Sequence, residues 1–217
     1  MVANESFIDS ATLRENVVAL ARNVGYVPSS RRSATANVSF TVDLGSGTSK
    51  SSVTLKAGLV ALGDFANTNY PFCTSEDITS PVSVGFAEFT IDIKQGTFVT
   101  NEFVVDTSQP NQKYIIPNSY VDTSTLNVEI RDTISSSSRQ PYSQIDNIVG
   151  ISTSSETYLI QEVQDEKYEL LFGDGVLGKK LSNGNVVNSS YIVTDGAGEM
   201  VFPTFLSLEN WLITMED

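Results

Sequence analysis

The sequence contains no histidine and one cysteine, and its 26 acidic side chains outnumber its 13 basic ones in a chain of 217 residues. Without histidine there is no Ser-His-Asp or Cys-His nucleophile pair, no HExxH zinc site and no imidazole proton shuttle. The formal charge of -13 argues against nonspecific nucleic-acid binding, because such affinity comes from clustered Lys and Arg. Most hydrolase templates are therefore excluded, and nonspecific nucleic-acid binding is disfavoured.

Long hydrophobic runs are also missing. The longest apolar run near the start, Val17 to Ala21, is too short for a signal peptide or a membrane span. The single Cys73 cannot form an intramolecular disulfide, so the fold does not depend on an oxidising compartment, and we expect this residue to be a small buried hydrophobe. The sequence therefore predicts a soluble protein that is made in the cytoplasm.

Small hydroxyl side chains are abundant. The chain has 28 Ser and 20 Thr, about 22% of its residues, together with 14 Gly. At 40% hydrophobic residues it can also bury a core. This composition is typical of a β-rich protein with many turns.

One amphipathic helix is predicted near the start of the sequence. Its apolar residues recur at the spacing of one helical stripe, and the stripe consists of Leu13, Val17, Leu20, Ala21 and Val24. Gly25 and Pro28 favour an end near Val24. Because only one stripe is apolar, we expect it to pack on a sheet or on another subunit, with Leu13, Val17, Leu20 and Val24 as candidate interface residues.

From Ala36 onward the hydrophobic period changes to two, which is typical of half-buried antiparallel strands. The clearest case has Phe89, Ile91 and Ile93 alternating with polar neighbours, and Leu126, Val128 and Ile130 repeat the pattern. Further strands are predicted at Ala36 to Val42, Ser52 to Leu55, Thr97 to Val105, Lys113 to Ile116, Thr157 to Val163, Tyr168 to Phe172 and Val186 to Thr194. The fold class is α+β, mainly antiparallel β with one N-terminal amphipathic helix.

A possible boundary lies at Ser135 to Ser138, the segment most typical of a linker. It would separate a β-rich domain at 34–140 from a second β lobe at 141–198, after an N-terminal helix and arm at 1–33. A surface loop within one domain explains the segment almost as well. Both alternatives stay open at the level of sequence.

The segment from Gly173 to Lys180 nearly matches the phosphate loop G-x-x-x-x-G-K-[ST], but Lys180 stands where the hydroxyl residue belongs. Turn residues follow it where a phosphate loop needs a helix. We therefore predict a tight loop between strands, in which glycines adopt positive φ, rather than a nucleotide site.

Four acidic residues lie close together at Glu162, Asp165, Glu166 and Glu169. They lack the D-x-[DN]-x-[DN]-G spacing of a calcium loop, so we interpret them as a solvated strand edge. No pair among the 26 acids stands out as a glycosidase pair. The sequence predicts no catalytic residue, no cofactor site and no metal site.

Two long segments carry a family resemblance. Residues 2–28, beginning Val2-Ala3-Asn4-Glu5-Ser6-Phe7, and residues 168–196, which include Phe172-Gly173-Asp174-Gly175 and Gly178, resemble the baseplate wedge subunit of T4-like contractile-tailed bacteriophages and the broader baseplate J-like group. The resemblance spans residues 2–198 and makes Phe172, Gly173, Asp174, Gly175 and Gly178 a family-motif loop. Members of this family are considerably longer, so we expect the chain to be a fragment.

The resemblance implies a structural protein of the virion and not an enzyme. Its expected partners are a second copy of itself, as a dimer, and other baseplate wedge proteins, with no nucleic acid and no membrane insertion. The alternative from another class is a carbohydrate-binding, adhesin-like β module of a phage tail, which predicts an aromatic-lined pocket. A glycan hydrolase comes third.

The end of the chain departs from the family pattern after Gly198. The family continues with an Asn-Gly step and a Phe-rich strand, whereas residues 199–217 form an atypical tail. We interpret the tail as the product of a frameshift after Glu199. The encoding DNA tests this interpretation, which fails if no single-base insertion restores a long open reading frame.

Overall fold

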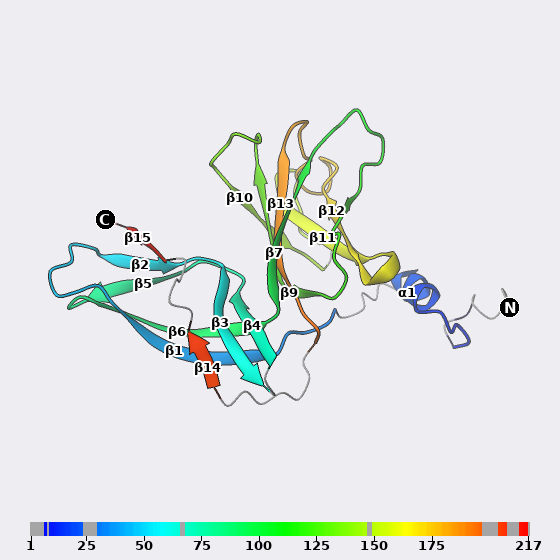
Figure 1. The fold of residues 1–217 in the computed structure, drawn as a ribbon. Coiled ribbons are helices and arrows are strands. Elements are labelled where there is room, and N and C mark those ends of the chain that lie inside the picture. Colours follow the sequence, from blue (N-terminus) through cyan, green and yellow to red (C-terminus); the bar gives the residue numbers. More distant parts are fainter. Residues whose placement is uncertain are drawn as a thin grey trace. The chain divides into compact units, whose positions relative to one another are not determined.

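The structure is a computed structural model that describes residues 7, 9–23, 30–65, 68–146, 149–196, 204–207 and 213–216. It consists mainly of antiparallel β-strands in two sheets, which confirms the β-rich class predicted from the sequence (Figure 1). Helical structure within these residues is confined to α1 (Arg14–Asn23) and the short 3-10 helix η2 (Gln164–Glu166). Neither helix has the length and apolar character that crossing a bilayer requires.

The chain forms two compact units whose segments alternate along the sequence. Unit 1 comprises Met1–Ser30, Asn101–Tyr120 and Val128–Ser189, and unit 2 comprises Arg31–Thr100, Val121–Asn127 and Ser190–Asp217. The sequence had instead suggested consecutive lobes at 34–140 and 141–198. The difference arises because three long strands, β7 (Thr97–Val104), β9 (Val121–Arg131) and β13 (Val186–Val193), contribute residues to both units.

Unit 2 contains an eight-stranded sheet in the order β14-β3-β4-β6-β5-β2-β15, with β1 also paired to β6. Its strands pair antiparallel along this order, and β1 also pairs antiparallel with β6. Its strands are β1 (Thr35–Asp43), β2 (Ser52–Leu55), β3 (Gly58–Phe65), β4 (Thr68–Thr74), β5 (Ile78–Ser83), β6 (Phe86–Gln95), β14 (Thr204–Ser207) and β15 (Ile213–Glu216). The described parts of the atypical tail thus pair with β3 and β2.

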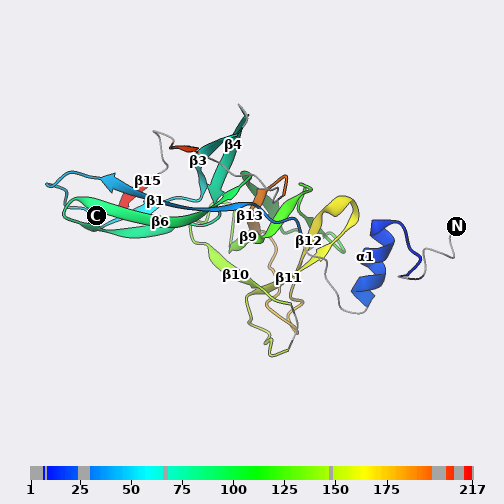
Figure 2. The same cartoon turned by 90° about the horizontal axis from the view of Figure 1, so that it is seen from below.

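The long pair β1 and β6 shows how the sequence pattern becomes a core. The two strands run side by side from Thr35 opposite Lys94 to Asp43 opposite Phe86 (Figures 1 and 2). In β6 buried residues alternate with exposed ones, as predicted. Phe40 stacks on its cross-strand partner Phe89 at a ring-centroid distance of 5.2 Å. The hydrophobic core beneath consists of Val53, Leu55, Val60, Ala61, Phe72, Ala87, Phe89, Ile91 and Ile93.

Cys73 is buried, which confirms the prediction of a small hydrophobe. Its Sγ donates to the carbonyl oxygen of Gly96 at 3.2 Å, and burial raises the pKa of the thiol. A neutral, covered thiol is a poor nucleophile.

Asp122 links the start of β9 to the segment that precedes β1 by hydrogen bonds. Its carboxylate accepts hydrogen bonds from the Ser33 amide at 2.9 Å, the Ser124 amide at 3.0 Å and the Ser124 hydroxyl at 2.6 Å. Ser33 and Asp122 are both buried. One side chain therefore satisfies several donors within unit 2.

The second sheet has the strand order β7-β13-β9-β10-β11-β12-β8. Its remaining strands are β8 (Tyr114–Ile115), β10 (Gln140–Gln144), β11 (Thr157–Glu162) and β12 (Tyr168–Phe172). β10 pairs antiparallel with β9 but parallel with β11, whereas β12 pairs antiparallel with both β11 and β8. Within unit 1 the sheet is therefore mixed.

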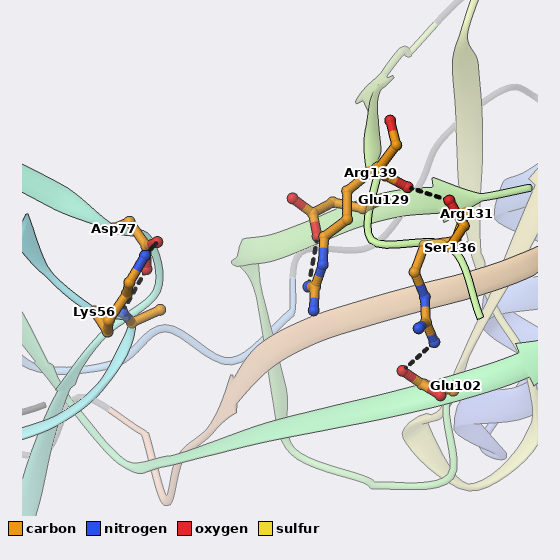
Figure 3. A network of polar contacts seen from close by, with 9 residues as sticks. Lys56, Asp77, Glu102, Glu129, Arg131, Ser136 and Arg139 are labelled. Atoms are coloured by element: carbon orange, nitrogen blue, oxygen red, sulfur yellow. Dashed lines mark hydrogen bonds and ion pairs between the residues drawn. The ribbon is translucent and has the colours of Figure 1, made fainter. Parts of the chain in front are cut away.

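The linker-like segment Ser135 to Ser138 is the connection between β9 and β10, which pair within unit 1. Arg131 on β9 binds Glu102 on β7 at 2.6 Å, and Arg139 binds Glu129 at 3.0 Å (Figure 3). Arg131 also donates to the carbonyl oxygen of Ile134 at 3.3 Å. The segment therefore lies within unit 1 and does not separate the two units.

Candidate functional site

The family-motif loop lies in unit 1, between β12 and β13. Its base is closed by a parallel bridge between Gly173 and Lys180. A Cβ at Gly173 would collide with the backbone of Gly178, which explains why a residue without a side chain is required there. Gly175 and Gly178 have φ values of +94° and +85°, which confirms the predicted positive-φ glycines.

Asp174 organises the tip of this loop. Its Oδ1 accepts hydrogen bonds from the amides of Val176 at 2.8 Å and Leu177 at 2.9 Å. The bonds from Leu177 and then Val176 lower the pKa of the Asp174 carboxyl, because they stabilise its charged form. The amide of Gly175 donates to the carbonyl oxygen of Gly178 at 3.1 Å. The loop conformation is thus fixed by its own polar groups.

The loop is also attached to the neighbouring segment 149–156. Gly178 N donates to Ser152 O at 3.1 Å, and Lys179 N donates to Ser155 O at 2.8 Å. The Lys179 ammonium binds Glu156 at 2.8 Å, and this hydrogen bond lowers the pKa of the Glu156 carboxyl. Two loops remote in sequence therefore support each other.

Two aliphatic side chains of this hydrogen-bonded loop are exposed to solvent. Val176 is 71% exposed and Leu177 is 46% exposed, and we call these two residues the motif-loop patch. On the supporting segment, Val149 is 87% exposed. Exposed aliphatic groups on a loop with a fixed conformation are well suited to contact a partner, because little conformational entropy is lost on binding.

The structure disfavours a phosphate-binding role for this loop. The residues after Lys180 form a turn at Asn183 and Gly184 and then enter β13. A phosphate loop needs a helix N-terminus at this place to supply amide donors. The prediction of a tight loop between strands is confirmed.

Phe172, the first residue of the motif, anchors the loop to the sheet. Its ring contacts three tyrosines, with centroid distances of 5.4 Å to Tyr114, 5.9 Å to Tyr142 and 6.3 Å to Tyr158. Burial raises the pKa of Tyr158 to about 12. No local pattern in the sequence predicts this cluster, because its members come from four different strands.

The interpretation of the acidic cluster as a solvated edge is wrong. Glu162 and Glu169 are only 3% and 5% exposed, whereas Asp165 is exposed. β11 and β12, which carry the two buried residues, both have neighbours on each side in the sheet. Glu169 accepts a hydrogen bond from Gln161 at 2.8 Å and lies 3.7 Å from the Lys113 ammonium. Pairing of this kind offsets the cost of burying charge.

The helical candidate residues do not form one buried stripe in the part of α1 that the structure describes. Val18 and Ala21 are buried, Val17 and Leu20 are partly buried, and Leu13 is 60% exposed. Val24 lies outside the described residues. Val17 and Leu20 thus lie on α1, and Leu13 directly precedes it. The loop that follows Phe172 of β12 is a separate segment of the same unit.

Among the described residues, no group of three or more Cys, Asp and Glu side chains is placed to hold a metal ion. A comparison of the chain with models of known protein families and with curated protein sequences finds no match.

Proposed function

We propose that this protein is a structural subunit of a phage tail baseplate wedge, where it makes subunit-subunit contacts in the baseplate ring. The sequence resemblance over residues 2–198 supports this proposal. The role is non-catalytic and requires no cofactor. It acts in the virion after synthesis in the cytoplasm of a bacterial host.

The structural observation that carries the proposal is the motif loop. Asp174 accepts two amide hydrogen bonds within the loop, and the loop amides donate to Ser152 and Ser155. These bonds fix a surface that exposes Val176 and Leu177. Interface cores are typically apolar residues surrounded by polar ones, and this loop offers that composition between Asp174 and Lys179. The motif therefore acts as a contact surface.

A second contact is formed by the N-terminal helix, which we infer to be an amphipathic docking element. Leu13, at its start, is largely exposed, whereas Val18 and Ala21 are covered. Leu13 therefore offers exposed apolar area that a partner helix or sheet can bury. The partners are a second copy of the chain and other wedge proteins.

The genes next to the encoding gene supply the test. Their products should be co-expressed with this chain, and we expect at least one to copurify with it in a defined ratio. The double variant Val176→Ser/Leu177→Ser should lose that partner, whereas Ile134→Ser, which changes an aliphatic residue of 68% exposure on the β9–β10 loop, should retain it. Neighbouring genes unrelated to tails, or copurification that the double variant does not affect, would contradict the proposal.

A further inference from the structure

Unit 1 contains a pocket of about 410 Å³ beside strand β12. Its lining residues come from the segment between Val105 and Tyr114, from Glu169 to Gly173, and from Lys180 and Leu181. All of these residues belong to the same compact unit. The volume lies in the range of small-ligand sites.

Aromatic rings and planar polar groups meet in this pocket. Tyr114 and Phe172 both line it, and their rings contact each other edge to face at 5.4 Å. The Tyr114 hydroxyl donates to Gln112 Oε1 at 3.3 Å, and Gln112 Nε2 donates to Val104 O at 2.8 Å. The bond to Val104 holds Gln112 in place, and the bond to Gln112 in turn holds the Tyr114 ring.

Glu169, which also lines the pocket, has a nearly buried carboxylate. The Glu169 side chain is 6% exposed, and its contacts with Gln161 Nε2 and Lys113 Nζ are both made by Oε2. A carboxylate accepts up to about four hydrogen bonds. Glu169 therefore retains acceptor capacity at the pocket.

Asp106, Asn111 and Lys180 add further polar groups to the lining. Asp106 accepts hydrogen bonds from Ser108 and Gln109, and the bonds from Ser108 lower the pKa of its carboxyl, so it is a charged acceptor at neutral pH. Asn111 is exposed at φ +62° and offers both a donor and an acceptor. The Lys180 ammonium, which also lines the pocket, supplies hydrogen-bond donors.

The charges of the site are nearly balanced. Asp106, Glu169 and Lys180 line the pocket, and Lys113, which lies outside the lining, pairs with Glu169. The charges around the pocket therefore favour neither an anion nor a cation. Paired acceptors and donors around aromatic rings match a ligand with many hydroxyl groups and apolar C–H faces. We propose that this pocket binds a neutral carbohydrate of one or two sugar units. Carbohydrate binding is a function beyond subunit assembly, and it corresponds to the alternative function that the sequence analysis left open.

The test uses the full chain and ligand-observed NMR with a panel of neutral hexoses, deoxyhexoses, N-acetylhexosamines and their disaccharides. We expect saturable binding of at least one sugar. Asn111→Gly removes the amide while permitting the positive φ, and Lys180→Ala removes the ammonium. Each should weaken binding about tenfold, as expected for the loss of one hydrogen bond in a binding site.

Lys179→Ala is the matched control, because the neighbouring lysine binds Glu156 and does not line the pocket. It should bind sugar as the wild type does. No saturable binding across the panel would overturn the inference, and so would binding that Asn111→Gly and Lys180→Ala leave unchanged. Failure here leaves the assembly proposal intact, since that proposal depends on Val176 and Leu177.

Discussion

Asp122 concentrates several hydrogen bonds in one buried side chain. Its replacement by alanine leaves the Ser33 amide and both Ser124 donors without their acceptor. We expect Asp122→Ala to lower the free energy of unfolding in urea by about 1–3 kcal/mol, the range for buried groups that lose a partner. Asp92→Ala removes an exposed bond to Asn37 and should change stability by less than about 0.5 kcal/mol. Equal effects of the two variants would contradict this account.

The same residue predicts a pH dependence. Burial raises the pKa of Asp122, but hydrogen bonds from Ser124 and Ser33 outweigh it and lower the pKa overall. A carboxyl with a lower pKa in the folded state than in the unfolded state stabilises the fold above the unfolded value of about 3.9, and this contribution is lost as pH falls through the folded pKa. The stability difference between wild type and Asp122→Asn should therefore shrink below about pH 4. A constant difference across an acid titration of unfolding would refute this assignment.

Gly173 is required by steric contact with the backbone. An added Cβ would meet Gly178, whose backbone cannot rotate away as a side chain could. Gly173→Ala should therefore destabilise the protein by about 1–3 kcal/mol, the usual cost of overpacking. Gly47 has open space around it and no positive φ, so Gly47→Ala should be neutral or stabilising by up to about 1 kcal/mol. Thermal unfolding of both variants tests the contrast.

At the scale of elements, β6 provides the sharpest test of the fold. Ile93 is fully buried and Glu88, on the other face of the same strand, is exposed. Ile93→Ala should cost about 2–5 kcal/mol, because it leaves a cavity in the core. Glu88→Ala should change the free energy of unfolding by less than about 0.5 kcal/mol. Similar losses for both variants would show that the predicted faces are wrong.

Strands with strict alternation could be predicted from the sequence, and others could not. β2 and β12 were predicted with the bounds observed, and β6 was predicted with the correct buried face. β4 and β5 were missed because each contains a proline, which usually argues against a strand. Pro71 lacks an amide donor, but its carbonyl oxygen still accepts from Gly96 N at 2.9 Å. Tertiary pairing thus overrides the local signal.

The candidate site was predictable only in its local part. The turn chemistry of Gly173, Asp174, Gly175 and Gly178 is encoded within the segment, and the structure shows the tight loop expected there. The pocket and the buried Glu169 depend on residues from β8, β12 and the loops around them, which no local pattern links. Acidic residues in sequence were therefore interpreted as solvated, although pairing with Gln161 and Lys113 allows Glu169 to be buried.

At the scale of the whole molecule, net charge and exposed apolar residues have opposite effects on association. A formal charge of -13 makes copies of the chain repel one another. Val176 and Leu177 offer apolar area that contact with a partner would remove from water. A subunit with this combination should associate only where complementary surfaces meet, which agrees with the proposed assembly role.

Sedimentation equilibrium of the full chain over a range of concentrations tests the central claim most directly. We expect a reversible dimer for the wild type. Ile134→Ser should form the same dimer, because this substitution leaves the motif-loop patch intact. The double variant Val176→Ser/Leu177→Ser should shift the equilibrium toward monomer while retaining the wild-type unfolding temperature, since both side chains are exposed. A wild-type chain that stays monomeric at every concentration, or a dimer that the double variant does not weaken, would contradict the account.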